Sequence, residues 1–331
     1  MRPVVRASMS PDVFAMLFDS PRLARLAELA CVAEPLLLDP DDTSSIDDTE
    51  VLITSWGAPR LDKAMLDKMP RLRAVLHAAG TVQGLVSDDL WERRVLVTTA
   101  ADANAIPVAE FTFASVILAF KRVFTHMQQP AEMKGRWAEL RNESSYGSLG
   151  RTVGVVGFSR IGRRVVSMLQ QLENVQVLVA DPMVDPAEVA AAGAVLMPLS
   201  EMLPRVDVLT VHAPSLASTY QMIGATELAA LPDGATLINT ARGALIDHDA
   251  LLFECRTGRL DAILDVTDPE PLPADSELYR LPNVAITPHV AGSLGTEVRR
   301  LADSALDDLA SLVEGNTPDH VVAHHDLRLS A

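Results

Sequence analysis

The stretch from 152 to 181 constrains the fold more than any other part of the sequence. It opens with the apolar run VGVV at 153–156, of the kind that is buried on both faces of a parallel sheet. The turn GFSRIG at 157–162 leads into a segment with helical apolar spacing, and a second apolar run at 175–180 ends at Asp181. Strand, glycine-rich turn, helix, strand and acid in this order predict a βαβ unit with a ligand at its turn.

The ligand that such a turn fits is a dinucleotide. Backbone N–H groups and the positive end of the helix face the pyrophosphate, and the acid accepts hydrogen bonds from a ribose hydroxyl. Serine replaces the usual middle glycine at Ser159, and its hydroxyl is able to donate to a phosphate oxygen. A βαβ unit whose turn binds nothing is the alternative.

Length and charge narrow the class of protein. With 331 residues the chain is long for one core, so we expect two domains. The formal net charge of −16 argues against nucleic acid and against anionic membrane surfaces as partners. Two cysteines make no disulfide framework, and the apolar stretch 111–120 is half of a membrane span. We therefore expect a soluble, cytoplasmic protein with no membrane contact.

The first hundred residues alternate strand-like and helix-like segments, which predicts an α/β domain of its own. A long apolar helix follows, and we place Pro107 near its first turn and Lys121-Arg122 near its end. A last amphipathic helix is predicted at 296–314, long enough to return to the first domain.

Beyond Asp181, predicted strands at 206–211, 235–239, 260–266 and 283–287 continue the sheet. Polar residues stand at or just after the ends of these strands. The carboxyl ends of parallel strands share one edge, so this edge should collect His212, Arg242, Asp265 and His289.

Three motifs follow the fingerprint in order: INTARGALID around Arg242, DVTDPEPLP around Glu270, and TPHVAGS around His289. With them, nearly the whole sequence resembles the D-isomer-specific 2-hydroxyacid dehydrogenase family, of the phosphoglycerate, glyoxylate and hydroxypyruvate type. The resemblance implies an α/β protein of two doubly wound parallel-sheet domains. A Rossmann NAD-binding domain, residues 107–299, would be inserted into a flavodoxin-like substrate domain, residues 1–106 with 300–331. It also implies an active site in the cleft and a homodimer.

Carried over to this sequence, the resemblance makes His289 the acid/base, Glu270 its partner and Arg242 the anchor of the substrate carboxylate. The oxidation of a 2-hydroxy acid requires the same types of residue. A histidine exchanges protons near neutral pH, and a neighbouring carboxylate orients its ring and stabilises the imidazolium. A guanidinium suits a planar carboxylate through its two-pronged donor geometry.

The fingerprint and the resemblance together predict two further sets of site residues. The predicted cofactor-binding residues, for NAD, are Gly157, Ser159, Arg160, Ile161, Gly162, Asp181, His212, Thr240, Ala241, Asp265 and Gly292. Within this set, Asp265 would face the nicotinamide amide. The predicted substrate-binding residues are Ala79, Gly80 and Arg242. We predict no metal site, and interpret His320, His324 and His325 as part of a flexible C-terminal tail.

The sequence therefore predicts an NAD-dependent oxidoreductase that acts on the CH–OH group of small 2-hydroxy acids, or reduces 2-keto acids. Formate or phosphite oxidation is a rival, but formate enzymes that resemble this family carry glutamine at the position of Glu270. The alternative from another class is a non-enzymatic, NAD-sensing protein such as the dehydrogenase-like corepressors, which keep the same motifs.

Overall fold

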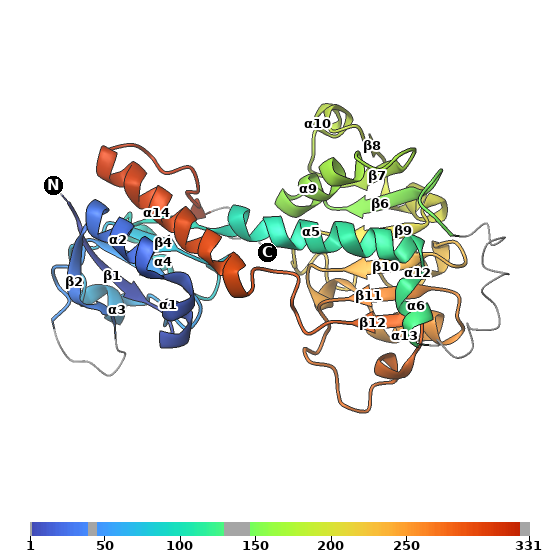
Figure 1. Cartoon of the computed structure of the whole chain (residues 1–331), viewed down its shortest axis with the longest axis horizontal. Helices are drawn as coiled ribbons and strands as arrows, with labels where there is room; N and C mark the ends of the chain where they lie inside the picture. Colours follow the sequence, from blue (N-terminus) through green and yellow to red (C-terminus); the bar gives the residue numbers. More distant parts are fainter. Residues whose placement is uncertain (1, 39–44, 129–145, 325–331) are drawn as a thin grey trace. The chain divides into compact units, whose positions relative to one another are not determined.

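The fold is described from a computed structural model of the chain, in which residues 2–38, 45–128 and 146–324 are described. The described residues form two compact units (Figure 1). Unit 1 holds those up to Ala105 and from Ser293 onward, and unit 2 runs from Ile106 to Gly292. Each unit contains one parallel sheet covered by helices, which confirms the predicted fold class. The predicted domains, 1–106 with 300–331 and 107–299, change over near these points and stay a prediction.

Unit 1 is built on five parallel strands in the order β2-β1-β3-β4-β5, the flavodoxin-like order. Neighbouring residues of β3 point into different cores, since Leu52 packs with one cluster of apolar side chains and Ile53 with another. Both faces are thus buried, which is why this strand reads as an unbroken apolar run. The elements of unit 1 are β1 (Val4–Ser8), α1 (Pro11–Leu17), α2 (Ser20–Leu29), β2 (Cys31–Leu37), β3 (Val51–Thr54), α3 (Lys63–Asp67), β4 (Ala74–His77), α4 (Asp88–Glu92), β5 (Leu96–Thr99), the 3-10 helix η4 (Gly295–Val298) and α14 (Arg299–Glu314).

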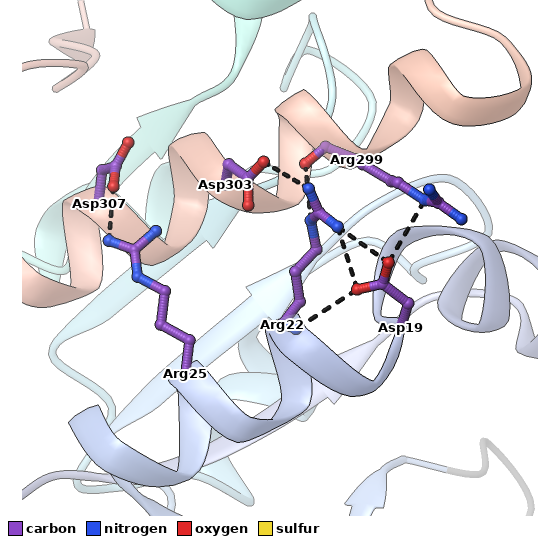
Figure 2. A network of polar contacts seen from close by, with 6 residues as sticks. All are labelled: Asp19, Arg22, Arg25, Arg299, Asp303 and Asp307. Carbon is purple, nitrogen blue, oxygen red and sulfur yellow. Dashed lines mark hydrogen bonds and ion pairs between the residues drawn. The ribbon is translucent and has the colours of Figure 1, made fainter.

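The C-terminal helix α14 packs beside α2 of the same unit (Figure 1). Its buried face lies in the core with β1, β3 and β4, and consists of Leu301, Ala302, Ala305, Leu306 and Leu309. Figure 2 shows the polar rim: Arg22 donates to Asp303 over 2.6 Å, and Arg25 to Asp307 over 2.6 Å. Such partly exposed pairs contribute at most about 1 kcal/mol each, so the apolar face is the main attachment and the pairs fix its alignment.

Unit 2 is built on seven parallel strands in the order β12-β11-β10-β9-β6-β7-β8. The chain reverses its direction of travel across the sheet between β6 and β9, the switch point at which such sheets bind ligands. The elements of unit 2 are the greater part of α5 (Ala101–Phe120), then α6 (Val123–Gln128), β6 (Thr152–Val156), α9 (Arg160–Leu169), β7 (Gln176–Ala180), α10 (Pro186–Ala191), β8 (Val195–Leu196), α11 (Leu199–Met202), η1 (Leu203–Arg205), β9 (Val208–Val211), α12 (Ala225–Ala230), β10 (Thr236–Asn239), η2 (Gly243–Leu245), α13 (His248–Arg256), β11 (Asp261–Leu264), η3 (Glu277–Arg280) and β12 (Val284–Ile286).

Helix α5 differs from the prediction in where it begins. It starts at Ala101, so Pro107 lies inside the helix rather than near its first turn. The earlier start is supported by the Thr99 hydroxyl, which accepts a hydrogen bond from the Ala101 N–H at 3.2 Å. With 20 residues, α5 is long and apolar enough to cross a membrane, the one such helix among the described residues. That is weak evidence for a span, because half of its apolar window is buried and Val116 belongs to the core around β6.

Candidate active site

The turn after β6 has the close contacts that its glycines predict. Gly157 has φ +91°, and a Cβ on it would lie 2.8 Å from the backbone of His212 and Ala213, just beyond β9. A Cβ on Gly162 would lie 2.0 Å from the carbonyl oxygen of Gly157. Only glycine fits at either position, so strand, turn and helix approach closely enough to leave backbone N–H groups at the sheet edge.

Ser159 is the N-cap residue of α9. Its Oγ accepts a hydrogen bond from the Gly162 N–H at 3.3 Å, so the hydroxyl hydrogen remains available as a donor. Arg160, exposed, and Ile161 open the helix behind it. A helix N-terminus of this kind suits an anion, because its first N–H groups and the helix dipole both favour negative charge.

Asp181 directly follows β7 and is held in one orientation. Its Oδ2 accepts the Phe158 N–H at 2.8 Å, and its Oδ1 accepts the Met183 N–H at 2.9 Å. A carboxylate oxygen has two lone pairs, so each keeps one acceptor site for a ribose hydroxyl.

Apart from Asp265, the remaining predicted cofactor residues in unit 2 are His212, Thr240, Ala241 and Gly292, and the first three are buried. The His212 imidazole is 3% exposed and pairs with the Thr210 hydroxyl, and burial lowers the pKa of His212 to about 3. It is therefore neutral, and His212 meets the turn through its backbone. Thr240 pairs with the Thr112 hydroxyl on α5 at 2.8 Å, Ala241 is buried beside it, and Gly292 ends the unit.

The structure brings His289 and Glu270 together. Nδ1 of His289 lies 2.6 Å from Oε1 of Glu270, and both side chains are about half exposed. The Glu270 charge also acts on the nearby Arg242: burial lowers the pKa of Arg242, and Glu270 opposes that shift. The three residues named from the motifs thus form one polar cluster in unit 2.

Arg242 is placed by neighbours that sequence reasoning missed. The buried Asn239 side chain accepts from the Ala241 N–H at 3.0 Å and donates to the Arg242 carbonyl at 2.9 Å, which shapes the turn after β10. A Cβ on Gly243 would lie 2.0 Å from the Thr267 carbonyl, so the turn meets the loop that leads to Glu270. An asparagine at a strand end is a known turn former, and this signal was available in the sequence.

Asp265 is predicted to face the nicotinamide amide. In the structure its carboxylate accepts hydrogen bonds from residues 287–291. Oδ1 accepts from the Thr287 hydroxyl at 2.6 Å and from the Val290 N–H at 2.8 Å, and Oδ2 accepts from the Ala291 N–H at 2.9 Å. Its backbone carbonyl accepts the His289 N–H at 3.0 Å. His289 has φ +53°, a left-handed conformation that costs energy outside glycine. The four hydrogen bonds to Asp265 hold His289 in this conformation. The contact of Asp265 with the nicotinamide amide stays a prediction.

The predicted substrate residues Ala79 and Gly80 lie in unit 1, in the loop after β4. The expectation of a flexible tail is wrong at His320, which pairs with the buried Asp308 at 3.0 Å just before the buried Val322. His324 pairs with Asp88 at 3.3 Å, and His325 lies outside the described residues. The described residues contain no cluster of side chains suited to a metal ion.

These features define a class. A seven-stranded doubly wound sheet carries a glycine turn after β6, a fixed acid after β7 and a polar cluster at its carboxyl edge, all of which fit a bound dinucleotide. Residues 114–291 match the family model described as "D-isomer specific 2-hydroxyacid dehydrogenase, NAD binding domain". The chain belongs to this family, and unit 2 contains its NAD-binding domain, which confirms the predicted resemblance and cofactor.

Among its relatives, the D-3-phosphoglycerate dehydrogenase of Methanocaldococcus jannaschii is 30% identical over 281 residues, which cover 84% of this chain and 52% of that protein. Glyoxylate/hydroxypyruvate reductase B of Yersinia enterocolitica is 30% identical over 287 residues, 86% of each. This chain thus spans about half the length of the phosphoglycerate dehydrogenase. A phosphoglycerate oxidoreductase from Rhizobium etli has the same fold, with a TM-score of 0.79, 22% identity, and coverage of 98% and 99%.

Proposed function

We propose that this protein is an NAD-dependent 2-hydroxyacid dehydrogenase that works as a reductase of small 2-keto acids. The observation that carries the proposal is the contact of 2.6 Å between His289 Nδ1 and Glu270 Oε1, beside Arg242, at the edge of an NAD-binding sheet. Relatives named as reductases and dehydrogenases of 2-hydroxy acids support the reaction class.

The proton-transfer step follows from which ring nitrogen is engaged. Glu270 accepts the hydrogen on Nδ1, so Nε2 of His289 is the atom that gives a proton to the keto oxygen during reduction and takes it back during oxidation. By accepting this hydrogen, the Glu270 carboxylate keeps the ring in one orientation. When bound, the nicotinamide ring supplies the hydride for reduction and accepts it in the reverse direction.

Arg242 is proposed to bind the substrate carboxylate. Its guanidinium stays charged despite the lowering of its pKa by burial, because arginine does not deprotonate in proteins. Partial burial also strengthens its attraction for an anion relative to an exposed arginine. The backbone of Ala79 and Gly80 is proposed as a second carboxylate-binding group.

We also propose which residues bind the cofactor, the oligomeric state and the compartment of the enzyme. Cofactor binding is proposed at Gly157, Ser159, Arg160, Ile161 and Gly162 for the pyrophosphate and at Asp181 for the ribose. We propose a homodimer that acts in the cytoplasm. Arg60, exposed beyond the loop after β3, is the residue proposed to favour substrates with a second anionic group.

The test is turnover by the purified protein with NADH and a panel of keto acids: glyoxylate, hydroxypyruvate, its phosphorylated form, pyruvate and bulky 2-keto acids. The matched control is His289→Asn, which keeps a polar side chain but loses proton exchange. We expect turnover of at least one keto acid, a loss of at least 100-fold in His289→Asn, and nearly unchanged NADH binding. NADH binding without turnover of any keto acid would refute the reductase and favour an NAD-sensing protein.

A further inference from the structure

The loop after β4 has its carbonyl groups turned towards buried hydroxyls. The Ser55 hydroxyl donates to the Ala78 carbonyl at 2.8 Å. The single hydrogen of the Thr99 hydroxyl is shared between two carbonyls, those of Ala79 at 2.9 Å and of Gly80 at 2.8 Å, and the Ala79 carbonyl also accepts the Ala100 N–H at 3.1 Å. Both donors are almost fully buried, with 2% and 7% of their surface exposed. Three successive carbonyls are therefore fixed from the inside of unit 1.

This arrangement decides where the N–H groups of the loop point. In a trans peptide the C=O and the N–H of the next residue lie on opposite sides, so the N–H groups of Ala79, Gly80 and Thr81 point away from the hydroxyls. Within the described parts of the chain, no acceptor meets any of these three N–H groups. Successive N–H groups that face one way form a concave anion-binding surface, as the proposed function requires for a substrate carboxylate.

Thr99 is the centre of this arrangement. It ends β5 beside His77 of β4, and its Oγ also accepts the Ala101 N–H at 3.2 Å where α5 begins. One hydroxyl thus ties the loop to the sheet and to the start of a long helix. The next support, His77, pairs with the Thr54 hydroxyl at 2.9 Å.

We infer that Thr99 is a positioning residue for substrate binding: its hydroxyl holds the Ala79 and Gly80 carbonyls inward, so that the N–H groups of the loop face the substrate carboxylate. The inference rests on the proposed function. Thr99 does not touch the substrate, and its effect is confined to the geometry of the loop.

The experiment compares Thr99→Val, which keeps the shape but removes the hydroxyl, with Thr99→Ser, which keeps the hydroxyl. Loss of these bonds should raise KM for the keto acid about tenfold in Thr99→Val, with kcat and the Kd for NADH within about twofold of wild type. Thr99→Ser should restore KM to within about twofold. A lower Tm with unchanged KM, or an equal effect on NADH binding, would overturn the inference.

A second measurement separates this inference from the proposed function. Oxalate, an unreactive dicarboxylate, is titrated into the full-length protein while the backbone amide signals of Ala79, Gly80 and Thr81 are followed by NMR. The signals should shift in wild type and Thr99→Ser, and require about tenfold more oxalate in Thr99→Val. This holds even if no keto acid is turned over. Equal titrations in all three proteins overturn the inference. If Thr99→Val does not fold, Thr99→Ala, which also removes the hydroxyl, takes its place with Thr99→Ser as its control.

Discussion

Replacing Asp265 by asparagine should impair catalysis by loosening the loop that carries His289. Asp265 is 2% exposed, and its carboxylate accepts three hydrogen bonds from that loop at 2.6–2.9 Å. Asparagine keeps the shape but presents one NH2 group, a donor, where an oxygen faced a donor. At least one charge-assisted hydrogen bond is lost, at a cost of about 1.5–3 kcal/mol.

The lost hydrogen-bond energy should lower catalytic activity, because these bonds keep His289 in its left-handed conformation with φ +53°. A displaced loop breaks the alignment of its imidazole with Glu270 and with the substrate. If about 3 kcal/mol of positioning is lost, kcat/KM should fall roughly 100-fold. The assay is steady-state oxidation of NADH by the best keto acid, with thermal unfolding measured on the same samples.

Asp261→Asn is the matched control. Asp261 begins the same strand, β11, and its buried carboxylate pairs with Arg122 at 3.0 and 3.1 Å. Its replacement should lower Tm as much as Asp265→Asn does, but leave kcat/KM within a few-fold of wild type. If the two variants lose activity equally, or if Asp265→Asn is fully active, the loop-holding argument is wrong.

Three further predictions follow from single side chains. Arg242→Lys should raise KM for the keto acid at least tenfold and leave KM for NADH unchanged, because a two-pronged contact is lost; equal effects on both constants would indicate a structural role. Asp181 should make kcat/KM higher with NADH than with NADPH, whose 2′-phosphate it repels, and Asp181→Ser should narrow the difference; equal values for the two cofactors in wild type would contradict this. His77 and His212 have pKa values lowered by burial from 6.5 to about 4 and about 3, so the unfolded chain binds more protons in acid. The free energy of unfolding should therefore fall between pH 6.5 and 5, by about 2 kcal/mol for each histidine, and a urea titration that gives the same value at both pH values would refute this.

The fold could be predicted wherever the physical signal is local. The strand of the fingerprint is buried on both faces, with Val155 in one core and Val156 in another, and this burial gives the apolar run that marks it. Strand β2 (Cys31–Leu37) was not predicted, because it is a mostly exposed edge strand that contains Glu34 and Pro35.

In the candidate site, too, some features could be predicted from the sequence and others could not. The motifs and the family resemblance named Arg242, Glu270 and His289 and predicted that the last two are partners, and the structure places Nδ1 of His289 2.6 Å from Oε1 of Glu270. The roles of their supports could not be predicted, because each depends on contacts between residues far apart in the chain. Asp265 meets its partners 22 to 26 positions later, and the Thr99 hydroxyl reaches back 19 and 20 positions to two carbonyls.

The sequence by itself determined which residues are candidates for the chemistry and that most of them follow strands of one sheet, since apolar strands and the polar residues after them are visible in short stretches of chain. The tertiary structure decided which oxygens and N–H groups remain available for ligands. Asp265 is an example: its place after a strand was visible in the sequence, but only the fold shows that its carboxylate accepts hydrogen bonds from the loop of His289. A buried polar group must find partners wherever the fold brings them, and no local pattern records those partners.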